Sequence, residues 1–430
     1  MNFKLMHPAD QLVLIMERIY SYGMTTTSGG NLSILDDNGD IWITPAGIDK
    51  GSLTRDDMVR VTPSGEIIGR HKPSSEFPFH SIIYKRRLDI KAVLHAHPPA
   101  LLGFSIARIV PETNIIPNID TVCGEVRYAP YELPGSRELS ENIANVFSEG
   151  VSTVMLENHG VVVGKSDLFE AFKAFETLDY CARIQLQATK IGSLHTLSDR
   201  AIAVAEAKNS VSLSEFVPEG FSSPEKEARA SMCSLIKRAY HQRLFTSSQG
   251  TFSERMPDGG FIITPYGKDR KYLEPEDLVK IQGNMKELGK NPSRSVLFHK
   301  FIYALHPEIN SVILAHPPNL MAFAVSDAQL DSRIIPESYI MLRDVEKLPF
   351  GSTYLEPEET AKKLSLKTPV TLVENECCIV MGTSLLNAFD RLEVAEYSAK
   401  AIVNAETLGK IVKIDDSEVD RIIDAFHLER

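Results

Sequence analysis

Cysteine is scarce in this sequence, and the spacing of the few residues carries no recognisable chemistry. The five cysteines form an odd set without a CxxC pair, at positions 123, 181, 233, 377 and 378. A disulfide framework needs an even set and a thiolate metal site needs closely spaced pairs, so both are excluded. Long Pro, Gly or Ser tracts are missing too, and 43% hydrophobic with 24% charged residues describes a globular chain.

Long apolar runs are also lacking. In the N-terminal segment MNFKLMHPADQLVLIMERIYSYG, Asp10, Glu17 and Arg18 divide the apolar residues into a helical pattern, and no small-residue cleavage site follows. We therefore expect a cytoplasmic protein with no membrane partner.

Basic runs interleaved with aromatic residues are absent, and the formal net charge is -11. Such a chain repels a phosphate backbone, so we expect no nucleic-acid partner. Neither a GxGxxG fingerprint nor a Walker motif occurs. Any phosphate that the protein binds is then expected to belong to a small substrate rather than to a nucleotide.

What the sequence does contain is an internal repeat. The matching pairs, in chain order, are TSGGNLS at 27–33 with SSQGTFS at 247–253, TPAGIDK at 44–50 with TPYGKDR at 264–270, KPSSEFPFH at 72–80 with NPSRSVLFH at 291–299, and AVLHAHPP at 92–99 with SVILAHPP at 311–318. The order is kept and the offset stays at about 220 residues throughout, which predicts two homologous domains in tandem.

The join between the copies falls in SLSEFVPEGFSSPEKE, where turn-forming residues interrupt the helical pattern. We therefore predict domains at 1–221 and 222–430. Within a copy, short β-branched runs such as NLSIL, DIWITP and AVLHAH alternate with helical segments, and helices stand at both ends. This order predicts an α/β layered domain with a mainly antiparallel sheet.

Two histidines in AVLHAH are the first candidates for chemistry. His95 and His97 are one residue apart, so on a strand both side chains point to the same face and can share one ion, although a polar sheet face would show the same spacing. His159 in LENHGVVVG precedes a glycine at the mouth of another β run. Three histidines with an open fourth position are typical of a catalytic zinc site.

Glu76 in KPSSEFPFH stands at the start of an amphipathic helix, where it is either a helix cap or a functional carboxylate. Nearby, SGGNLS and TPAG form glycine-containing turns whose backbone N–H groups can cradle a phosphate together with Ser74 and Ser75. Each of these signals is weak when it is taken singly.

Together and in order, SGGNLS, TPAGIDK, KPSSEFPFH, AVLHAHPP, APYELPGSRELSENI and LENHGVVVG resemble the class II aldolase/adducin family, most closely its L-fuculose-phosphate aldolases. The resemblance covers roughly residues 8 to 208. It implies a three-layer αβα sandwich, here in two tandem copies. It also implies a zinc-dependent aldehyde-lyase that cleaves a ketose phosphate, such as L-fuculose 1-phosphate, to dihydroxyacetone phosphate and an aldehyde.

The resemblance also implies roles for individual residues. Zinc, or another divalent ion, is expected on His95, His97 and His159, with Glu76 as acid/base and Tyr131 as a proton donor from a neighbouring subunit. The expected phosphate-binding residues are Gly30, Asn31, Gly47, Ser74 and Ser75. Where the family often has Ser in the TPAG turn, this chain has Ala46.

Two other functions fit the same motifs. A sugar-phosphate epimerase of the L-ribulose-phosphate 4-epimerase type uses a similar zinc site, but it typically has Asp in PSSD where this chain has Glu76. An adducin-like scaffold needs no catalytic set, whereas the N-terminal copy keeps its three histidines and its glutamate. Related dehydratases and decarboxylases remain alternatives.

The second copy lacks this set. Ser295 stands at the position of Glu76, Leu314 at that of His95, and VENECC replaces LENHG, so only His316 remains. We expect a degenerate domain without catalysis. Because the family implies a four-fold ring with sites between neighbours, we expect a homo-oligomer, a dimer or larger, in which two chains supply the four domains and the C-terminal copies complete the active sites carried by the N-terminal copies.

Overall fold

The computed structural model describes residues 3–207 and 212–429, which form two compact units. The first comprises residues 1–113 and 119–183, and the second residues 114–118 and 184–430. This division follows contacts rather than the repeat, so the boundary at residue 221 between the two sequence copies stays a prediction. Within the described ranges, no helix is both long enough and apolar enough to cross a membrane.

The first unit is built on a sheet of eight strands. Its strands are β1 (Asn31–Leu35), β2 (Ile41–Ile43), β3 (Val59–Val61), β4 (Ile67–Ile68), β5 (Ala92–Ala96), β6 (Val126–Ala129), β7 (Thr153–Leu156) and β8 (Gly160–Lys165). Their order across the sheet is β4-β3-β2-β1-β5-β8-β7-β6. All neighbours are antiparallel except β6 and β7, which are parallel. The most apolar strands, β5, β7 and β8, lie next to one another and are almost entirely buried.

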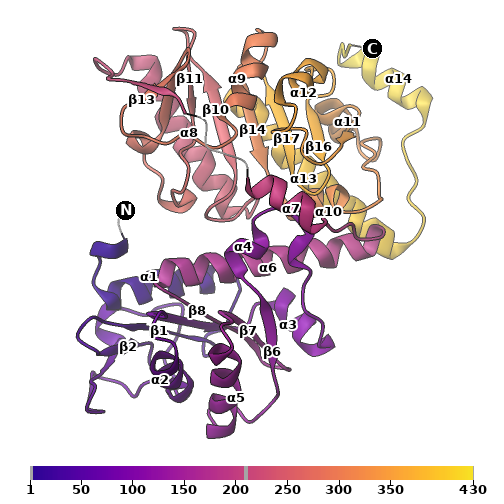
Figure 1. The fold of residues 1–430 in the computed structure, drawn as a ribbon. Helices are drawn as coiled ribbons and strands as arrows, with labels where there is room; N and C mark the ends of the chain where they lie inside the picture. Colours follow the sequence, from indigo (N-terminus) through magenta and orange to yellow (C-terminus); the bar gives the residue numbers. More distant parts are fainter. Residues whose placement is uncertain (1–2, 208–211, 430) are drawn as a thin grey trace. The chain divides into compact units, whose positions relative to one another are not determined.

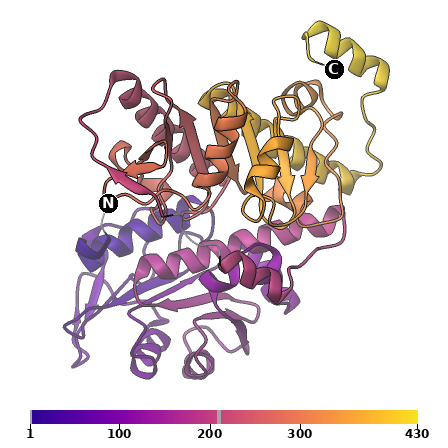
Figure 2. The ribbon, with the colours of Figure 1, turned by 45° about the horizontal axis from the view of Figure 1, so that its top comes forward.

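Helices cover both faces of this sheet. The helices of the first copy are α1 (Pro8–Ser21), α2 (Phe77–Arg86), α3 (Pro99–Ala107), α4 (Ile119–Cys123), α5 (Arg137–Ser148) and α6 (Leu168–Ile191). Helices α1 and α6 lie on one side of the sheet, and α2 and α5 pack together on the other side (Figures 1 and 2). The amphipathic α2 and α5 bury Phe79, Ile83, Ile143 and Phe147 against the sheet. The predicted three-layer αβα sandwich is therefore confirmed.

The second unit repeats this plan. Its elements are α7 (Asp199–Glu206), β9 (Ser214–Phe216), α8 (Ser223–His241), β10 (Thr251–Arg255), β11 (Phe261–Ile263), β12 (Val279–Gln282), β13 (Met285–Glu287), α9 (Val296–Leu305), β14 (Ser311–Ala315), α10 (Pro318–Ala324), α11 (Pro336–Leu342), β15 (Glu346–Leu348), α12 (Pro357–Lys363), β16 (Val370–Val373), β17 (Cys377–Gly382), α13 (Leu385–Leu408) and α14 (Asp416–Ala425). The strand order β15-β16-β17-β14-β10-β11-β12-β13 matches that of the first sheet, and β9 adds an edge strand parallel to β13. The tandem repeat is thus a repeat of topology as well as of sequence.

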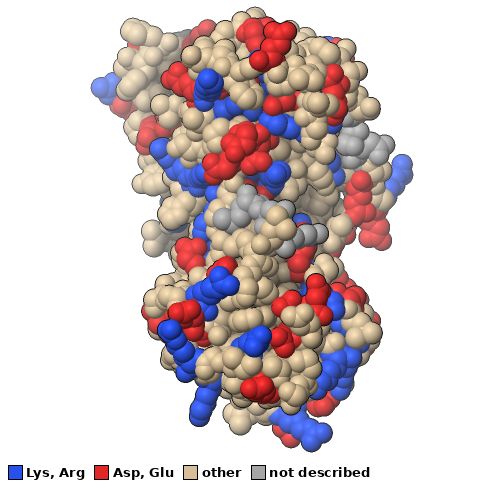
Figure 3. Space-filling model, turned by 90° about the vertical axis from the view of Figure 1, so that its left-hand side faces the viewer, with Lys and Arg blue, Asp and Glu red and all other residues tan. Residues whose placement is uncertain are grey.

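Charged side chains are mixed on the surface. On the face drawn in Figure 3, acidic and basic residues are interspersed on both units, and among the described residues of that face no continuous basic surface is visible.

Candidate metal centre

Strand β5 presents the first two histidines. Its neighbours are β1 and β8, so His95 lies in the middle of the sheet and is fully buried. His97 follows directly after the strand and is partly buried. Because the two residues alternate with Ala96, both imidazoles lie on the same face, as their spacing predicts.

The third histidine comes from the turn between β7 and β8. Asn158 adopts a left-handed conformation with a φ of 53°, and His159 N–H donates to the Leu156 carbonyl at 3.2 Å. Gly160 then brings β8 close to the end of β5. A Cβ on Gly160 would lie 2.6 Å from Cδ2 of His97 and 2.7 Å from the carbonyl oxygen of Ala96, so a side chain is excluded here.

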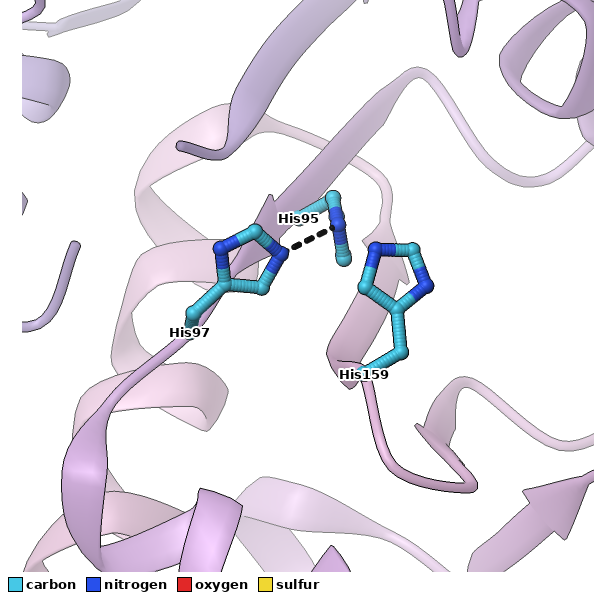
Figure 4. A group of neighbouring side chains, drawn as sticks. All are labelled: His95, His97 and His159. Carbon is cyan, nitrogen blue, oxygen red and sulfur yellow. Dashed lines mark hydrogen bonds between the residues drawn. The ribbon is translucent and has the colours of Figure 1, made fainter. Parts of the chain in front are cut away.

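The three imidazoles form one cluster (Figure 4). One ligand nitrogen from each of His95, His97 and His159 lies within 4.8 Å of the others, and Nε2 of His97 is 3.0 Å from Nε2 of His95. Two nitrogens that each bind zinc at about 2.05 Å in tetrahedral geometry lie roughly 3.3 Å apart. The cluster therefore has the dimensions of a single metal site, and it is the one such group that the described residues contain.

Burial keeps these histidines neutral. Desolvation, followed by the charge of His159, lowers the pKa of His95 to about 3. Desolvation, followed by the neighbouring histidines, lowers the pKa of His97 to about 3, and desolvation also lowers the pKa of His159. Nδ1 of His95 lies 3.0 Å from the Val161 carbonyl and donates to it, so Nε2 carries the lone pair. Neutral imidazoles with free lone pairs are the form that binds metal.

Glu76 lies against this cluster and does not cap its helix. It occupies the N-cap position of α2, yet its side chain makes no capping hydrogen bond. Instead Oε2 lies 3.3 Å from Nε2 of His95, and Oε1 lies 3.5 Å from Nε2 of His159. Oε1 is buried and has no hydrogen-bond partner among the described residues. A buried carboxylate oxygen without a partner, beside three neutral imidazoles, fits a divalent cation.

Asn31 holds the other carboxylate oxygen. It lies opposite His95 in the β1–β5 pairing, and its Nδ2 donates to Oε2 of Glu76 at 2.7 Å. Its Oδ1 lies 2.5 Å from Nε2 of His80 on α2. The side chain of Asn31, which the sequence predicted to bind phosphate, is thus engaged with Glu76 and His80.

Three other predicted phosphate residues, Gly47, Ser74 and Ser75, lie on two turns that a bridge joins. Pro45 and Pro73 pair as an isolated antiparallel bridge, and Ser74 N–H donates to the Thr44 carbonyl at 3.2 Å. Ser74 is buried and accepts from the Glu76 N–H at 3.3 Å, whereas Ser75 is exposed.

The two predicted phosphate-site glycines differ in their surroundings. Gly47 has a φ of 69° and open space around it. Gly30 has a φ of 70°, and its missing Cβ would lie 2.8 Å from the carbonyl oxygen of His95. Gly30 is therefore required for the close approach of β1 to β5.

Tyr131 has contacts other than the histidine cluster. It follows β6, its side chain is 52% exposed, and its N–H donates to Glu157 at 3.2 Å. Among the described residues its hydroxyl makes no hydrogen bond to Glu76 or to the three histidines. A single chain thus assembles the histidines, Glu76 and Asn31, but not Tyr131.

His80 belongs to this site, although the sequence analysis assigned it no role. Its signal was present in the sequence, because Glu76, His80 and Tyr84 are spaced by four along α2 and lie on one face of the helix. Asn31 and Ser33 alternate on β1 and lie on one face of the sheet. Hydrogen bonds connect these two rows of residues.

The matching site of the second copy has lost these groups. Ser295 is the N-cap of α9 and Leu314 is buried in β14. Glu376, at the position of His159, accepts hydrogen bonds from Gly351 N–H and from the Thr353 hydroxyl. No metal-binding group is found there among the residues that the structure describes.

The chain matches known proteins over both copies. The sequence profile of the Class II Aldolase and Adducin N-terminal domain matches residues 10–186 and again 230–403. The 5-deoxy-D-ribulose 1-phosphate aldolase of Bacillus thuringiensis serovar kurstaki is 34% identical over 189 residues, which is 43% of this chain and 86% of that protein.

Two further relatives act on other substrates according to their names. The 3-oxo-tetronate 4-phosphate decarboxylase of Haemophilus influenzae is 32% identical over 42% of this chain and 89% of its own length. The L-fuculose phosphate aldolase of Methanococcus maripaludis is 33% identical over 40% of this chain and 93% of its own length. A solved L-fuculose 1-phosphate aldolase aligns with 46% of this chain and 93% of its own at 32% identity, with a TM-score of 0.42.

Each relative aligns with less than half of this chain, whereas the family profile matches it twice. The repeat, the sheet topology and the profile agree, and the chain belongs to the class II aldolase/adducin family, of which it carries two tandem copies.

Proposed function

We propose that the N-terminal copy is a zinc-dependent aldehyde-lyase that cleaves a ketose phosphate, such as L-fuculose 1-phosphate, into dihydroxyacetone phosphate and an aldehyde. The observation that carries this proposal is Glu76, whose buried carboxylate faces three neutral histidines and caps no helix. A purely structural glutamate at a helix start would turn to the free N–H groups of that helix. Relatives named as aldolases of phosphorylated sugars support the same reaction class.

His95, His97 and His159 would hold the ion, with Glu76 next to it. Three nitrogen ligands suit zinc, while iron, cobalt or manganese would be held by the same set. When bound, the ion polarises the substrate carbonyl and stabilises the negative charge that develops as the carbon–carbon bond breaks.

Glu76 would move the proton that the cleavage requires. The electron pair of the broken bond stays on the carbon next to the carbonyl, and Glu76 returns a proton to that carbon. The hydroxyl on the other fragment loses its proton as it becomes an aldehyde, and Tyr131 of a neighbouring subunit would accept this proton while passing its own phenolic proton to solvent. Glu76 takes up from solvent the proton that it gives to the carbon, so both groups return to their starting states and no net proton is consumed.

The two joined turns and the start of β1 would bind the phosphate. We assign this role to Gly30, Asn31, Gly47, Ser74 and Ser75, with Asn31 acting through its backbone because its side chain is engaged with Glu76. Gly47 and Ser75 lie at the open end of these turns, where backbone N–H groups and a hydroxyl suit a phosphate.

Decarboxylation is the second candidate, since relatives named as 3-oxo-tetronate 4-phosphate decarboxylases match about as well as the aldolases. Both reactions leave an electron pair on a carbon next to a carbonyl, so one site serves either. Both reactions release dihydroxyacetone phosphate, and the second product distinguishes them: an aldehyde from cleavage of a ketose phosphate, or carbon dioxide from a 3-oxo-tetronate 4-phosphate. An epimerase would release neither product and would interconvert two ketose phosphates.

The assembly proposal concerns the source of the tyrosine. The register of β6 on β7 and of β15 on β16 places Phe350 at the position of Tyr131, because Ala129 pairs with Leu156 and Leu348 with Val373. A C-terminal copy would therefore offer a phenylalanine side chain, which has no hydroxyl. We propose an oligomer of at least two chains in which a second N-terminal copy supplies Tyr131, while C-terminal copies complete the ring.

The test compares His97→Ala with its counterpart His316→Ala in the second copy. Elemental mass spectrometry of the purified full chain should find about one divalent ion per chain, lost in His97→Ala and kept in His316→Ala, with thermal unfolding as the folding control. Ketose phosphates and a 3-oxo-tetronate 4-phosphate are then screened by coupled reduction of dihydroxyacetone phosphate, and the aldehyde and the carbon dioxide are measured separately. A metal-free wild-type protein, or equal metal loss in both variants, would refute the site. A metal-loaded protein that releases carbon dioxide from the 3-oxo-tetronate 4-phosphate, but no aldehyde from any ketose phosphate, would refute the aldolase and support the decarboxylase.

A further inference from the structure

A continuous chain of buried hydrogen bonds runs from the core of the first copy to Glu76. The Tyr84 hydroxyl lies 2.6 Å from Oγ of Ser33, and Oγ of Ser33 lies 2.7 Å from Nδ1 of His80. Nε2 of His80 lies 2.5 Å from Oδ1 of Asn31, and Nδ2 of Asn31 lies 2.7 Å from Oε2 of Glu76. All five residues are buried, with exposed fractions of at most 8%.

The direction of every hydrogen bond in this chain is determined by the carboxylate at its end. An ionised carboxylate only accepts, so Asn31 must turn its amide nitrogen to Glu76 and its oxygen to His80. His80 must then donate from Nε2, which leaves Nδ1 to accept from Ser33, and Ser33 in turn accepts from Tyr84. Burial lowers the pKa of His80 well below its ordinary value, which agrees with a neutral ring of this single tautomer.

The second copy shows which part of the chain belongs to the fold. There the Ser253 hydroxyl lies 2.6 Å from Nδ1 of His299 and 2.7 Å from the Tyr303 hydroxyl, as in the first copy. The position of Asn31 is taken by Thr251, whose hydroxyl lies 2.8 Å from that of Ser293. The Tyr–Ser–His part therefore persists without an acid/base residue, and only the first copy extends it through an asparagine to a glutamate.

We propose that His80 is a positioning residue, which fixes the amide of Asn31 and through it the orientation of the Glu76 carboxylate toward the histidine cluster. A reversed amide would place its carbonyl oxygen against the carboxylate, which repels it. A rotated carboxylate would lose the separations of 3.3 and 3.5 Å from His95 and His159. This inference rests on the proposed function for its effect on turnover, but not for its effect on metal binding.

Two substitutions of His80 separate its two hydrogen bonds. His80→Gln keeps a donor near the position of Nε2 and loses the acceptor for Ser33, whereas His80→Asn keeps that acceptor and loses the donor to Asn31. Each removes one buried hydrogen bond, so a merely structural role predicts similar losses of stability and activity. Positioning predicts that only His80→Asn impairs the site.

The first measurement is a cobalt titration of the full chain, followed by its visible absorption. We expect His80→Asn to weaken cobalt binding and to lower kcat on the cleaved ketose phosphate by about tenfold or more, with little change in KM, and His80→Gln to stay within about threefold of wild type. His299→Asn and His299→Gln make the same changes in the second copy and should alter neither quantity.

Asn31→Ala gives the complementary test. If His80 acts through Asn31, adding His80→Asn to Asn31→Ala lowers kcat and cobalt affinity no further. Should His80→Asn fail to fold, Asn31→Ala with and without His80→Gln provides the same comparison. Equal losses in His80→Asn and His80→Gln, additive losses in the double variant, or a loss in His299→Asn would overturn the proposal. If the wild type cleaves no ketose phosphate, the proposed function fails, and the cobalt titration alone decides on His80.

Discussion

Gly160 is the position at which a single added carbon tests the geometry of the metal centre. Its backbone has an ordinary φ, so the absence of a side chain is a matter of space rather than of conformation. In Gly160→Ala the new Cβ would lie 2.7 Å from the Ala96 carbonyl oxygen and 2.6 Å from Cδ2 of His97. The carbonyl belongs to the sheet, since Ala96 pairs with Val161, and it cannot move freely.

The cost of this substitution has two parts. Overpacking against a rigid sheet costs about 1–3 kcal/mol of the free energy of unfolding. In a domain of this size, each kcal/mol lowers Tm by about 2–4 °C. In addition, His97 must rotate away from the other imidazoles, and we expect the loss of its geometry to weaken zinc binding by about tenfold or more, which is ~1.4 kcal/mol.

Zinc competition against a chromophoric chelator and thermal unfolding of the metal-free chain measure the two parts separately. Gly103→Ala is the control, because Gly103 lies on α3 with nothing within 4 Å of its missing Cβ. That variant should keep its zinc affinity and unfold at the same or a slightly higher Tm, since Ala favours a helix over Gly. Wild-type Tm and zinc affinity in Gly160→Ala would refute the packing argument.

Two further predictions concern pH and assembly. Because burial lowers the pKa of His95 and His97 to about 3, the folded metal-free chain takes up fewer protons than the unfolded chain, whose histidines titrate near 6.5. The free energy of unfolding of the metal-free chain should therefore be highest above pH 6.5. It should fall as the pH decreases toward 3, by up to about 1.4 kcal/mol per pH unit for each histidine, and it should fall less steeply in His97→Ala. Glu76→Gln and Tyr131→Phe should each lower kcat, by about 100-fold for Glu76. Co-expression of the two variants should restore part of the activity, whereas full activity in Tyr131→Phe would instead favour a neighbour that offers Phe350.

Much of the site was predictable because its spacing is local. The alternation of His95 and His97 requires only that the segment be a strand, and the repeat of whole motifs fixes the number of copies. Sequence alone left the role of Glu76 open, since a cap and a functional carboxylate share the same helix position. The structure distinguishes them by the direction of the side chain, which depends on the placement of α2 over β1 and β5.

What the sequence did not yield are contacts between elements far apart in the chain. The edge strand β6 and helix α5 were not among the predicted elements, although Ser136 caps α5 by accepting from Leu139 N–H. The hydrogen bonds of the Asn31 side chain were not predicted either, because its partners Glu76 and His80 lie at and within a helix more than 40 residues later, beyond the reach of local pattern reasoning. The phosphate role that the family resemblance implies for Asn31 stays a prediction.

The second copy separates what this fold needs from what its chemistry needs. Ser253, His299 and Tyr303 keep the hydrogen bonds of their counterparts, since burying any one of them without its partners would cost the full desolvation of a polar group. Ser295 and Leu314 take the places of Glu76 and His95, and both are buried in the second copy. The fold therefore keeps the Tyr–Ser–His group in both copies, whereas only the first copy, which holds the histidine cluster, extends it through Asn31 to Glu76.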